Sequence, residues 1–216
     1  MRLDAHVVVC RPSFHLDAAL VVEPGEVVAL VGANGAGKTT FLHAVAGIVE
    51  ISKGHVRLGP RVLDDAATGV HLPTEERRAG LVFQQHMLFP HLSALENVAF
   101  GLRAQGVPRR EARRHAREWL DRLGVLEHAD RPATRLSGGQ AQRVALARTL
   151  AVEPDILLLD EPFAALDEAA RPVVRDLLRE RVFDDSRPVI LVTHNPSDAR
   201  ALADRVVRLT SGRLAS

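Results

Sequence analysis

Short apolar runs and longer periodic stretches of apolar residues alternate along the chain. The expected strands are 27–31, 54–58, 81–83, 156–160, 189–193 and 206–209. Several of these runs are almost continuously apolar, as expected of strands that are buried on both faces of a parallel sheet. Helical patterns lie between them, so strands and helices alternate along the chain. The sequence therefore predicts an α/β protein whose core sheet is mostly parallel.

Helical periodicity fills the stretches between these strands. The expected helices are 39–49, one that starts near 93, 108–123, 140–151, one that follows Asp167, and 196–203. Ser93 and Glu96 have the spacing of a capping box, Pro108 suits the first turn of its helix, and Gly124 would end that helix. The helices between Gln84 and about residue 152 interrupt the strand pattern. We therefore expect them to form an insertion into the sheet core.

A glycine-rich loop follows the first buried strand and precedes a helix. The loop consists of Gly32, Ala33, Asn34, Gly35, Ala36, Gly37, Lys38 and Thr39. Glycines let consecutive backbone N–H groups turn toward phosphate oxygens, and the following helix adds its positive end. In this pattern Lys38 reaches the β- and γ-phosphates, the Thr39 hydroxyl binds Mg²⁺ and Thr40 touches the α-phosphate. The loop therefore predicts ATP and Mg²⁺ as cofactors.

Three polar residues stand at the ends of later strands. Asp160 ends the apolar strand 156–160, so its carboxylate is expected to bind Mg²⁺ through water. Glu161 follows and could accept a proton from attacking water. His194 also ends a strand and could hydrogen-bond the γ-phosphate, because ligands bind at the carboxyl ends of parallel strands. The alternatives are two solvated acids at an ordinary strand end and a structural histidine.

A second element suited to anions lies in the inserted segment. Ser137, Gly138 and Gly139 begin a helix without bulky side chains, so exposed N–H groups and the helix dipole favour an anion there. A plain N-cap followed by glycines is the alternative. The phosphate loop already surrounds the γ-phosphate of its own nucleotide. This second element therefore suits a phosphate that another subunit presents.

Composition restricts the possible functions. The chain has 216 residues, a formal net charge of +1 and one cysteine, so it does not resemble a nucleic-acid-binding protein and no internal disulfide is expected. No apolar run approaches the roughly 20 residues that cross a bilayer, and the first residues lack a signal-peptide pattern. A soluble, intracellular protein is expected. The histidines outside position 194 lack metal-ligand spacing, so we expect no zinc site.

Together, these motifs resemble the ATP-binding subunit of an ABC transporter across essentially the full chain. Residues 32–39 are similar to the Walker A motif, 136–140 to the family signature, and 156–161 to Walker B with the catalytic glutamate. Residues 164–167 resemble the D-loop. Gln84 corresponds to the Q-loop glutamine and His194 to the switch histidine.

The resemblance implies a P-loop NTPase (RecA-like) fold, with a mostly parallel core, an antiparallel β part and an inserted α-helical subdomain. It implies one domain, 1–216, with a catalytic core at about 1–84 and 153–216 and a helical signature subdomain at about 85–152. No C-terminal regulatory domain is expected. Catalytic roles fall to Glu161, His194, Lys38 and Gln84. The metal ligands are Thr39, Gln84 and Asp160.

The resemblance also implies an assembly. Two copies would form a head-to-tail homodimer across two ATP molecules. The residues of one copy that would cap the ATP held by Lys38 of the other are Ser137, Gly138, Gly139 and Gln140. A transmembrane permease would be a direct partner and a solute-binding protein an indirect one. The chain would then lie in the cytoplasm, on the inner face of the membrane.

The direction of transport and its cargo depend on shorter similarities. Residues 72–92 are similar to bacterial importer subunits, and 61–65 most resemble the molybdate importer ATPase. We therefore expect uptake of a small solute, with molybdate as the best choice. Thiamine, sulfate and other importers, or an exporter, remain open. A soluble ABC protein usually has a long coiled-coil insertion or two cassettes, and a P-loop kinase would not need the element at 137–139.

Two further assignments concern contacts. Family members often stack adenine on an N-terminal tyrosine or tryptophan, but this chain has no tyrosine. Phe14 is the nearest candidate and could equally be a core residue. Met87, Leu88, Phe89, Pro90 and Leu92 directly follow the Q-loop. They either help to form a groove for a short cytoplasmic helix of the permease or pack locally.

Overall fold

The computed structural model describes residues 1–181 and 187–214 and divides them between two units. The first unit comprises residues 1–81, 155–161 and the described part of 183–216. The second comprises 82–154 and the described part of 162–182. The expected helical subdomain, 85–152, falls within the second unit, which also takes in residues after 161.

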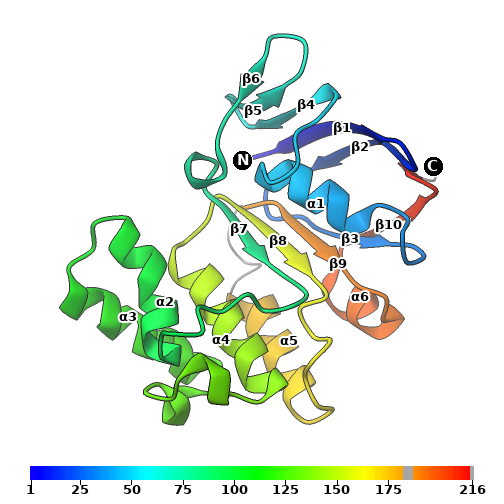
Figure 1. The fold of residues 1–216 in the computed structure, drawn as a ribbon. Helices are drawn as coiled ribbons and strands as arrows, with labels where there is room; N and C mark the ends of the chain where they lie inside the picture. The colour runs from blue at the N-terminus through cyan, green and yellow to red at the C-terminus, as the bar shows by residue number, and fades with distance from the viewer. Residues whose placement is uncertain (182–186, 215–216) are drawn as a thin grey trace. The chain divides into compact units, whose positions relative to one another are not determined.

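The first unit is built on one mixed sheet. From edge to edge, its order is β6-β5-β4-β1-β2-β11-β10-β3-β9-β8-β7. The strands are β1 (Leu3–Arg11), β2 (Phe14–Val22), β3 (Val27–Val31), β4 (Lys53–Leu58), β5 (Arg61–Asp65), β6 (Val70–His71), β7 (Ala79–Val82), β8 (Ile156–Asp160), β9 (Val189–Val192), β10 (Arg205–Thr210) and β11 (Arg213–Leu214). Figure 1 shows β7, β8 and β9 side by side.

Strands β10, β3, β9 and β8 form the parallel part of this sheet. Val28 of β3 pairs with Ile190 of β9, which also pairs with Leu158 of β8. Every residue of β8 and β9 is buried, which accounts for their continuous apolar sequences. The carboxyl ends of these strands meet at one edge of the sheet. The predicted α/β fold with a mostly parallel core and an antiparallel part is confirmed.

The antiparallel part was only partly expected. β1 pairs with both β2 and β4 over most of its length. In β2, Leu16, Ala18 and Leu20 are buried while the residues between them are exposed. Alternation of this kind is a weaker signal than a continuous apolar run, which is why the sequence reading identified β4 but not this hairpin. The expectation that the strand at 206–209 is the last one was wrong, because β11 follows it and pairs with β10 and β2.

Two α-helices of the first unit flank this sheet. They are α1 (Lys38–Ala46) and α6 (Pro196–Leu202), and the short 3-10 helix η1 (Thr74–Glu76) belongs to the same unit. α1 packs against β1, β8 and β9. It ends at Ala46 rather than Val49, because Gly47 adopts a left-handed conformation with φ 82° and its N–H binds the carbonyls of His43 and Ala44.

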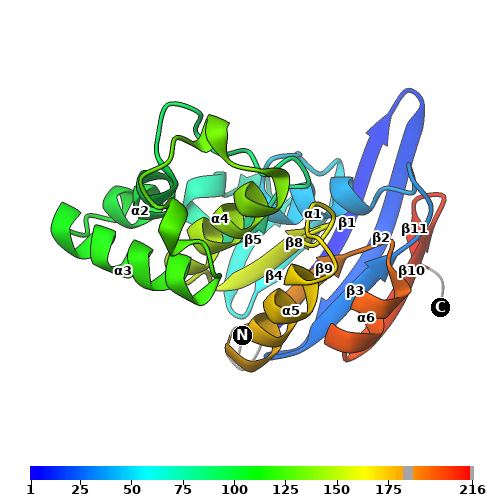
Figure 2. The same cartoon turned by 90° about the horizontal axis from the view of Figure 1, so that it is seen from below.

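The second unit consists of helices. These are α2 (Ala94–Ala104), α3 (Arg109–Arg122), α4 (Gly138–Ala151), α5 (Ala170–Arg181), η2 (Leu126–His128) and η3 (Ala133–Arg135). Figure 2 shows α2, α3 and α4 side by side, and each packs against the other two. Ser93 caps α2 by accepting the N–H of Glu96. Within the described ranges, no helix combines the length and apolar character that crossing a membrane requires.

Candidate active site

The glycine-rich loop between β3 and α1 encloses the side chain of Lys38. Lys38 Nζ donates to the carbonyl oxygens of Gly32 at 2.8 Å and Ala33 at 2.9 Å. The side chain is buried, with only 9% of the residue exposed. An ammonium group is small enough for this position, whereas a planar guanidinium is not. The loop therefore holds a positive charge at its centre, at the N-terminal end of α1, where the helix itself favours anions.

Thr39 connects the loop to the end of β8. Its hydroxyl Oγ1 donates to Asp160 Oδ2 at 2.8 Å, although the two residues lie 121 positions apart. Asp160 is 3% exposed. A hydroxyl and a carboxylate are oxygen donors of the kind that Mg²⁺ prefers. The residues present therefore fit a magnesium site, which Thr39 and Asp160 would help to hold.

Glu161 and His194 form a second polar pair at the same sheet edge. His194 Nδ1 lies 2.9 Å from Glu161 Oε1. The Glu161 side chain is 11% exposed and that of His194 is 70% exposed. The Glu161 backbone has a φ of 51°, in the left-handed region, and its N–H binds the carbonyl of Val192. Non-glycine residues in this conformation cluster at functional sites.

One further titratable group on α1 lies near this edge. Burial lowers the pKa of His43 below its ordinary value, and the negative charge of Asp160 opposes this change only in part. His43 follows Thr39 by one helical turn, on the same side of α1. The neutral imidazole is therefore the favoured form beside the predicted metal ligand. The sequence reading did not single out this residue.

Phe14 lies beside the phosphate loop. The ring is half-buried and packs against the core of the first unit. A Cβ atom added at Gly37 would lie 3.1 Å from Phe14 Cζ. An aromatic ring next to Gly37 suits either role considered from the sequence, adenine contact or core packing.

The second unit carries the candidate residues of the signature segment. Ser137 caps α4 by accepting the N–H of Gln140 at 3.3 Å, while Gln140 Oε1 accepts the N–H of Ser137 at 2.9 Å. Gly138 and Ser137 are exposed at the helix start. A Cβ added at Gly139 would lie 3.2 Å from the carbonyl oxygen of Ala165, so this glycine packs against the segment that resembles the D-loop.

The residues after Gln84 form a loop that two polar side chains, the half-buried Arg148 and the buried Asn97, hold in place. Gln84 itself is exposed. Arg148 donates to the carbonyls of His86 at 3.1 Å and Met87 at 2.8 Å. Asn97, which is fully buried, donates to the carbonyl of Phe89 and accepts its N–H. Sequence reasoning missed both residues, because a backbone-binding Arg or Asn in a helix has no motif of its own.

This loop and helix α2 also present apolar side chains to solvent. Met87 is 56% exposed and Phe100 is 46% exposed. The rings of Phe89 and Phe100 are 4.5 Å apart, and the Arg148 guanidinium lies over Phe89. Burial lowers the pKa of Arg148, but an arginine remains charged at neutral pH. The half-buried Phe89 therefore packs locally while Met87 and Phe100 stay accessible.

Comparison with known proteins decides the family. A model described as "ABC transporter" matches residues 16–164, which include the phosphate loop, the signature segment and the acidic pair at the end of β8. The chain belongs to the ABC transporter family. The family indicated by the sequence motifs is thus confirmed.

The relatives of this ABC transporter chain include importer subunits. It is 49% identical over 204 residues to the molybdenum import ATP-binding protein ModC of Mycobacterium tuberculosis, covering 93% of this chain and 55% of the relative. It is 42% identical over 202 residues to the sulfate/thiosulfate import ATP-binding protein CysA 1 of Agrobacterium fabrum, covering 92% and 57%. The chain thus spans somewhat more than half the length of these curated relatives.

A solved ABC structure has the same fold. An ATP-binding cassette, described as a dimer in a post-hydrolysis state bound to ADP and Pi, matches with a TM-score of 0.86 and 32% identity. The match covers 100% of this chain and 97% of the cassette. The fold of an ABC cassette therefore extends over the whole chain.

Proposed function

We propose that the chain is the ATP-hydrolysing motor subunit of a bacterial ABC importer for a small solute, with molybdate as the best-supported cargo. One observation supports this most strongly. A single edge of the sheet carries three features of the site: the Lys38 side chain, the Thr39–Asp160 hydrogen bond and the Glu161–His194 pair. This edge is where ligands bind in open α/β folds.

ATP binding would use the phosphate loop and its helix. The loop residues 32–37 supply backbone N–H groups, and Lys38 would exchange its bonds to the loop carbonyls for bonds to the β- and γ-phosphates. Thr40 would contact the α-phosphate and Phe14 the adenine ring. Thr39, Asp160 and Gln84 would hold Mg²⁺, which supplies charge neutralisation at the phosphates. The cassette bound to ADP and Pi supports the nucleotide assignment.

Hydrolysis would depend on Glu161. Its carboxylate accepts the proton of the attacking water. His194 Nδ1 holds the carboxylate from the solvent side at 2.9 Å, which fixes the orientation of Glu161. The other ring nitrogen of His194 is then available to the γ-phosphate.

Two copies of the chain would complete each nucleotide site. The N-terminal end of α4 offers the N–H groups of Gly138 and Gly139 to an anion, and Ser137 is exposed beside them. In the capping box, the Gln140 side chain bonds to the main chain at Ser137, which keeps this helix end ordered. The dimeric state of the similar cassette supports a head-to-tail homodimer across two ATP molecules.

Coupling to transport would occur through a permease. Met87, three residues after Gln84, and Phe100 present apolar surface, which suits docking of a short cytoplasmic helix. A solute-binding protein would act through the permease, and the chain would lie on the cytoplasmic face of the membrane. The molybdenum importer relative favours molybdate. Sulfate is the second candidate because CysA 1 is also similar.

Uptake in cells tests this proposal. A strain lacking the chain should accumulate less molybdate, and the wild-type chain should restore uptake. The Glu161→Gln variant, expressed at the same level, should not restore it. Normal molybdate uptake in the deletion strain together with lost sulfate uptake would favour sulfate. Normal uptake of both, with net efflux of a solute lost, would contradict the importer assignment.

A further inference from the structure

The C-terminal end of α1 is bound by a fully buried arginine that belongs to none of the motifs above. Arg77 has 0% of its surface exposed. Its Nη1 donates to the carbonyls of Ala44 at 3.1 Å and Val45 at 3.2 Å, both in the last turn of α1. Its Nε donates to the carbonyl of Leu72 at 2.7 Å. One guanidinium thus joins the end of α1 to the segment that leads out of β6.

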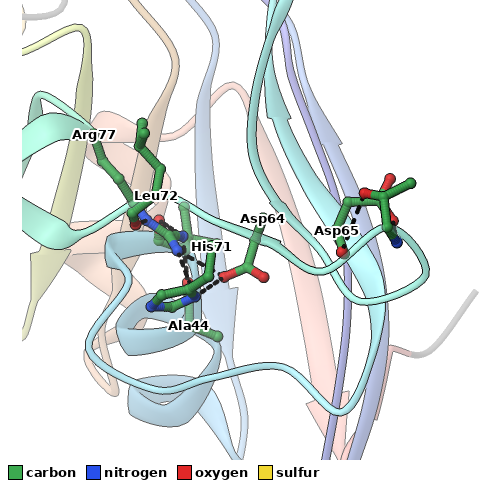
Figure 3. Close-up of polar contacts among 8 residues, drawn as sticks. Ala44, Asp64, Asp65, His71, Leu72 and Arg77 are labelled. Carbon is green, nitrogen blue, oxygen red and sulfur yellow. Dashed lines mark hydrogen bonds and ion pairs between the residues drawn. The ribbon is translucent and has the colours of Figure 1, made fainter.

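A buried carboxylate fixes this guanidinium. Asp64 of β5 accepts from Arg77 Nη2 at 2.6 Å, and the Asp64 side chain is 3% exposed. His71 Nδ1 lies 2.9 Å from the same Asp64 oxygen, and the His71 side chain is 39% exposed. Figure 3 shows Arg77, Asp64 and His71 converging beside Ala44. A buried charge is retained only when it is paired and hydrogen-bonded, and this pair meets both conditions.

We propose that Arg77 is a positioning residue for the nucleotide site, which it controls by holding α1 at the end opposite the phosphates. This inference rests on the proposed ATPase function. α1 has nine residues, with Lys38 and Thr39 in its first turn and Ala44 and Val45 in its last. Such a helix is about 13 Å long and moves as a rigid body, so a tilt at the Arg77 end displaces Lys38 and Thr39.

Only an arginine fits these contacts. The guanidinium spreads its donors over three nitrogens in a fixed plane, so it reaches Asp64, Leu72 and α1 at once. A lysine side chain has one nitrogen. It could keep the ion pair with Asp64 but would lose the hydrogen bonds to the α1 carbonyls. Gly47 makes the close approach possible, because a side chain there would collide with the guanidinium.

The test compares Arg77→Lys and the double variant Arg77→Met/Asp64→Asn with a matched control, Arg61→Met. Arg61 lies on β5, as Asp64 does, and donates to the Asp155 carboxylate and to the backbone carbonyl of Glu76. Both contacts lie outside α1. In the double variant no unpaired buried charge is left at Asp64, which limits misfolding.

The first readout is nucleotide affinity by calorimetry. Relative to Arg61→Met, both Arg77 variants should weaken ATP and ADP binding by about tenfold while AMP binding changes little, because the displaced groups bind the β- and γ-phosphates. Equal losses for AMP, ADP and ATP, or no loss, would overturn the proposal. A purely structural role predicts one of those two results.

The second readout is hydrogen exchange of residues 38–46 without nucleotide. Arg77→Lys should increase exchange along this segment several-fold, and Arg61→Met should not. Unchanged exchange in Arg77→Lys would overturn the inference. This readout needs no nucleotide. A wild-type chain that fails to bind ATP would therefore contradict the proposed function, while exchange would still decide whether Arg77 holds α1 in place.

Discussion

His194 Nδ1 lies 2.9 Å from Glu161 Oε1, and this pair joins an exposed imidazole to a largely buried carboxylate. Glu161 has little freedom of its own, since its backbone takes a left-handed conformation and its N–H is bound to Val192. The contact from His194 therefore helps to set the direction of the carboxylate. This geometry separates the roles of the two residues and leads to the first two predictions.

Glu161→Gln should abolish turnover without loss of ATP binding. The amide has nearly the shape of the carboxylate but cannot accept the proton of attacking water. Loss of a general base typically lowers a rate by about 10²–10⁴-fold. Phosphate release measures turnover, and calorimetry with ATP measures binding. Hydrolysis at close to the wild-type rate would remove Glu161 from its proposed role.

His194→Ala should slow hydrolysis, because it removes the contact that orients Glu161 and the proposed hydrogen bond to the γ-phosphate. Misplacement of a catalytic group by about 1 Å can cost on the order of a hundredfold in rate. Because His194 is mostly exposed, its removal should leave the free energy of unfolding nearly unchanged. Single-turnover hydrolysis and urea unfolding measure the two quantities. A slow variant that is also strongly destabilised would point to a structural histidine instead.

Thr39→Val and Asp160→Asn should weaken the Mg²⁺ dependence of nucleotide binding. The two side chains are hydrogen-bonded to each other at 2.8 Å, and we propose that both help to hold the ion. Loss of a ligand or its partner usually lowers metal affinity by about 10-fold to 100-fold. ATP affinity is measured with magnesium and with EDTA. If magnesium strengthens binding equally in both variants and the wild type, these residues are not ligands.

His43 should make the fold sensitive to mild acid. Burial lowers its pKa in the folded state below the unfolded value of about 6.5, with Asp160 opposing in part. Between these two pKa values the unfolded chain binds more protons than the folded one. The contribution of His43 to the free energy of unfolding is therefore present above about pH 6.5 and is lost as the pH falls below that value. Urea unfolding measures the free energy of unfolding at pH 7.5 and at pH 5.5. The decrease between the two pH values should be smaller for His43→Gln than for the wild type, and an identical decrease would contradict this prediction.

Met87→Ser should uncouple hydrolysis from transport. Met87 is 56% exposed, so its replacement should leave the fold intact while removing apolar contact area from the proposed permease surface. ATPase activity of the isolated chain should be retained, and solute uptake in cells should fall. Val62→Ser is the matched control, since Val62 is 39% exposed but belongs to the antiparallel part of the first unit. Equal uptake in the two variants would argue against docking at Met87.

Sequence patterns placed the candidate site residues next to strand ends, and the structure has them at the same edge of the sheet. Lys38, Asp160 and His194 follow continuous apolar runs, and the structure brings the first two together through Thr39. The helix starts at Ser93 and Ser137 were also visible, since capping depends on residues only three positions apart.

Features that depend on distant partners were not visible. Arg77 binds Asp64, 13 positions away, and Ala44, 33 positions away, so neither sequence spacing nor periodicity predicts these contacts. Gly47 ended α1 early although the apolar pattern continues to Val49. The β1–β2 hairpin was missed although Val7, Val8 and Val9 of β1 are buried, because the buried residues of β2 alternate with exposed ones.

The association of two chains around ATP is the central claim, and one measurement tests it most directly. The Glu161→Gln variant is brought to saturating ATP with Mg²⁺, and its mass in solution is measured by sedimentation equilibrium. The account predicts twice the mass of a single chain, and a return to single chains when magnesium is removed or when Ser137→Arg blocks the start of α4. A variant that binds ATP yet keeps the mass of one chain would contradict the account.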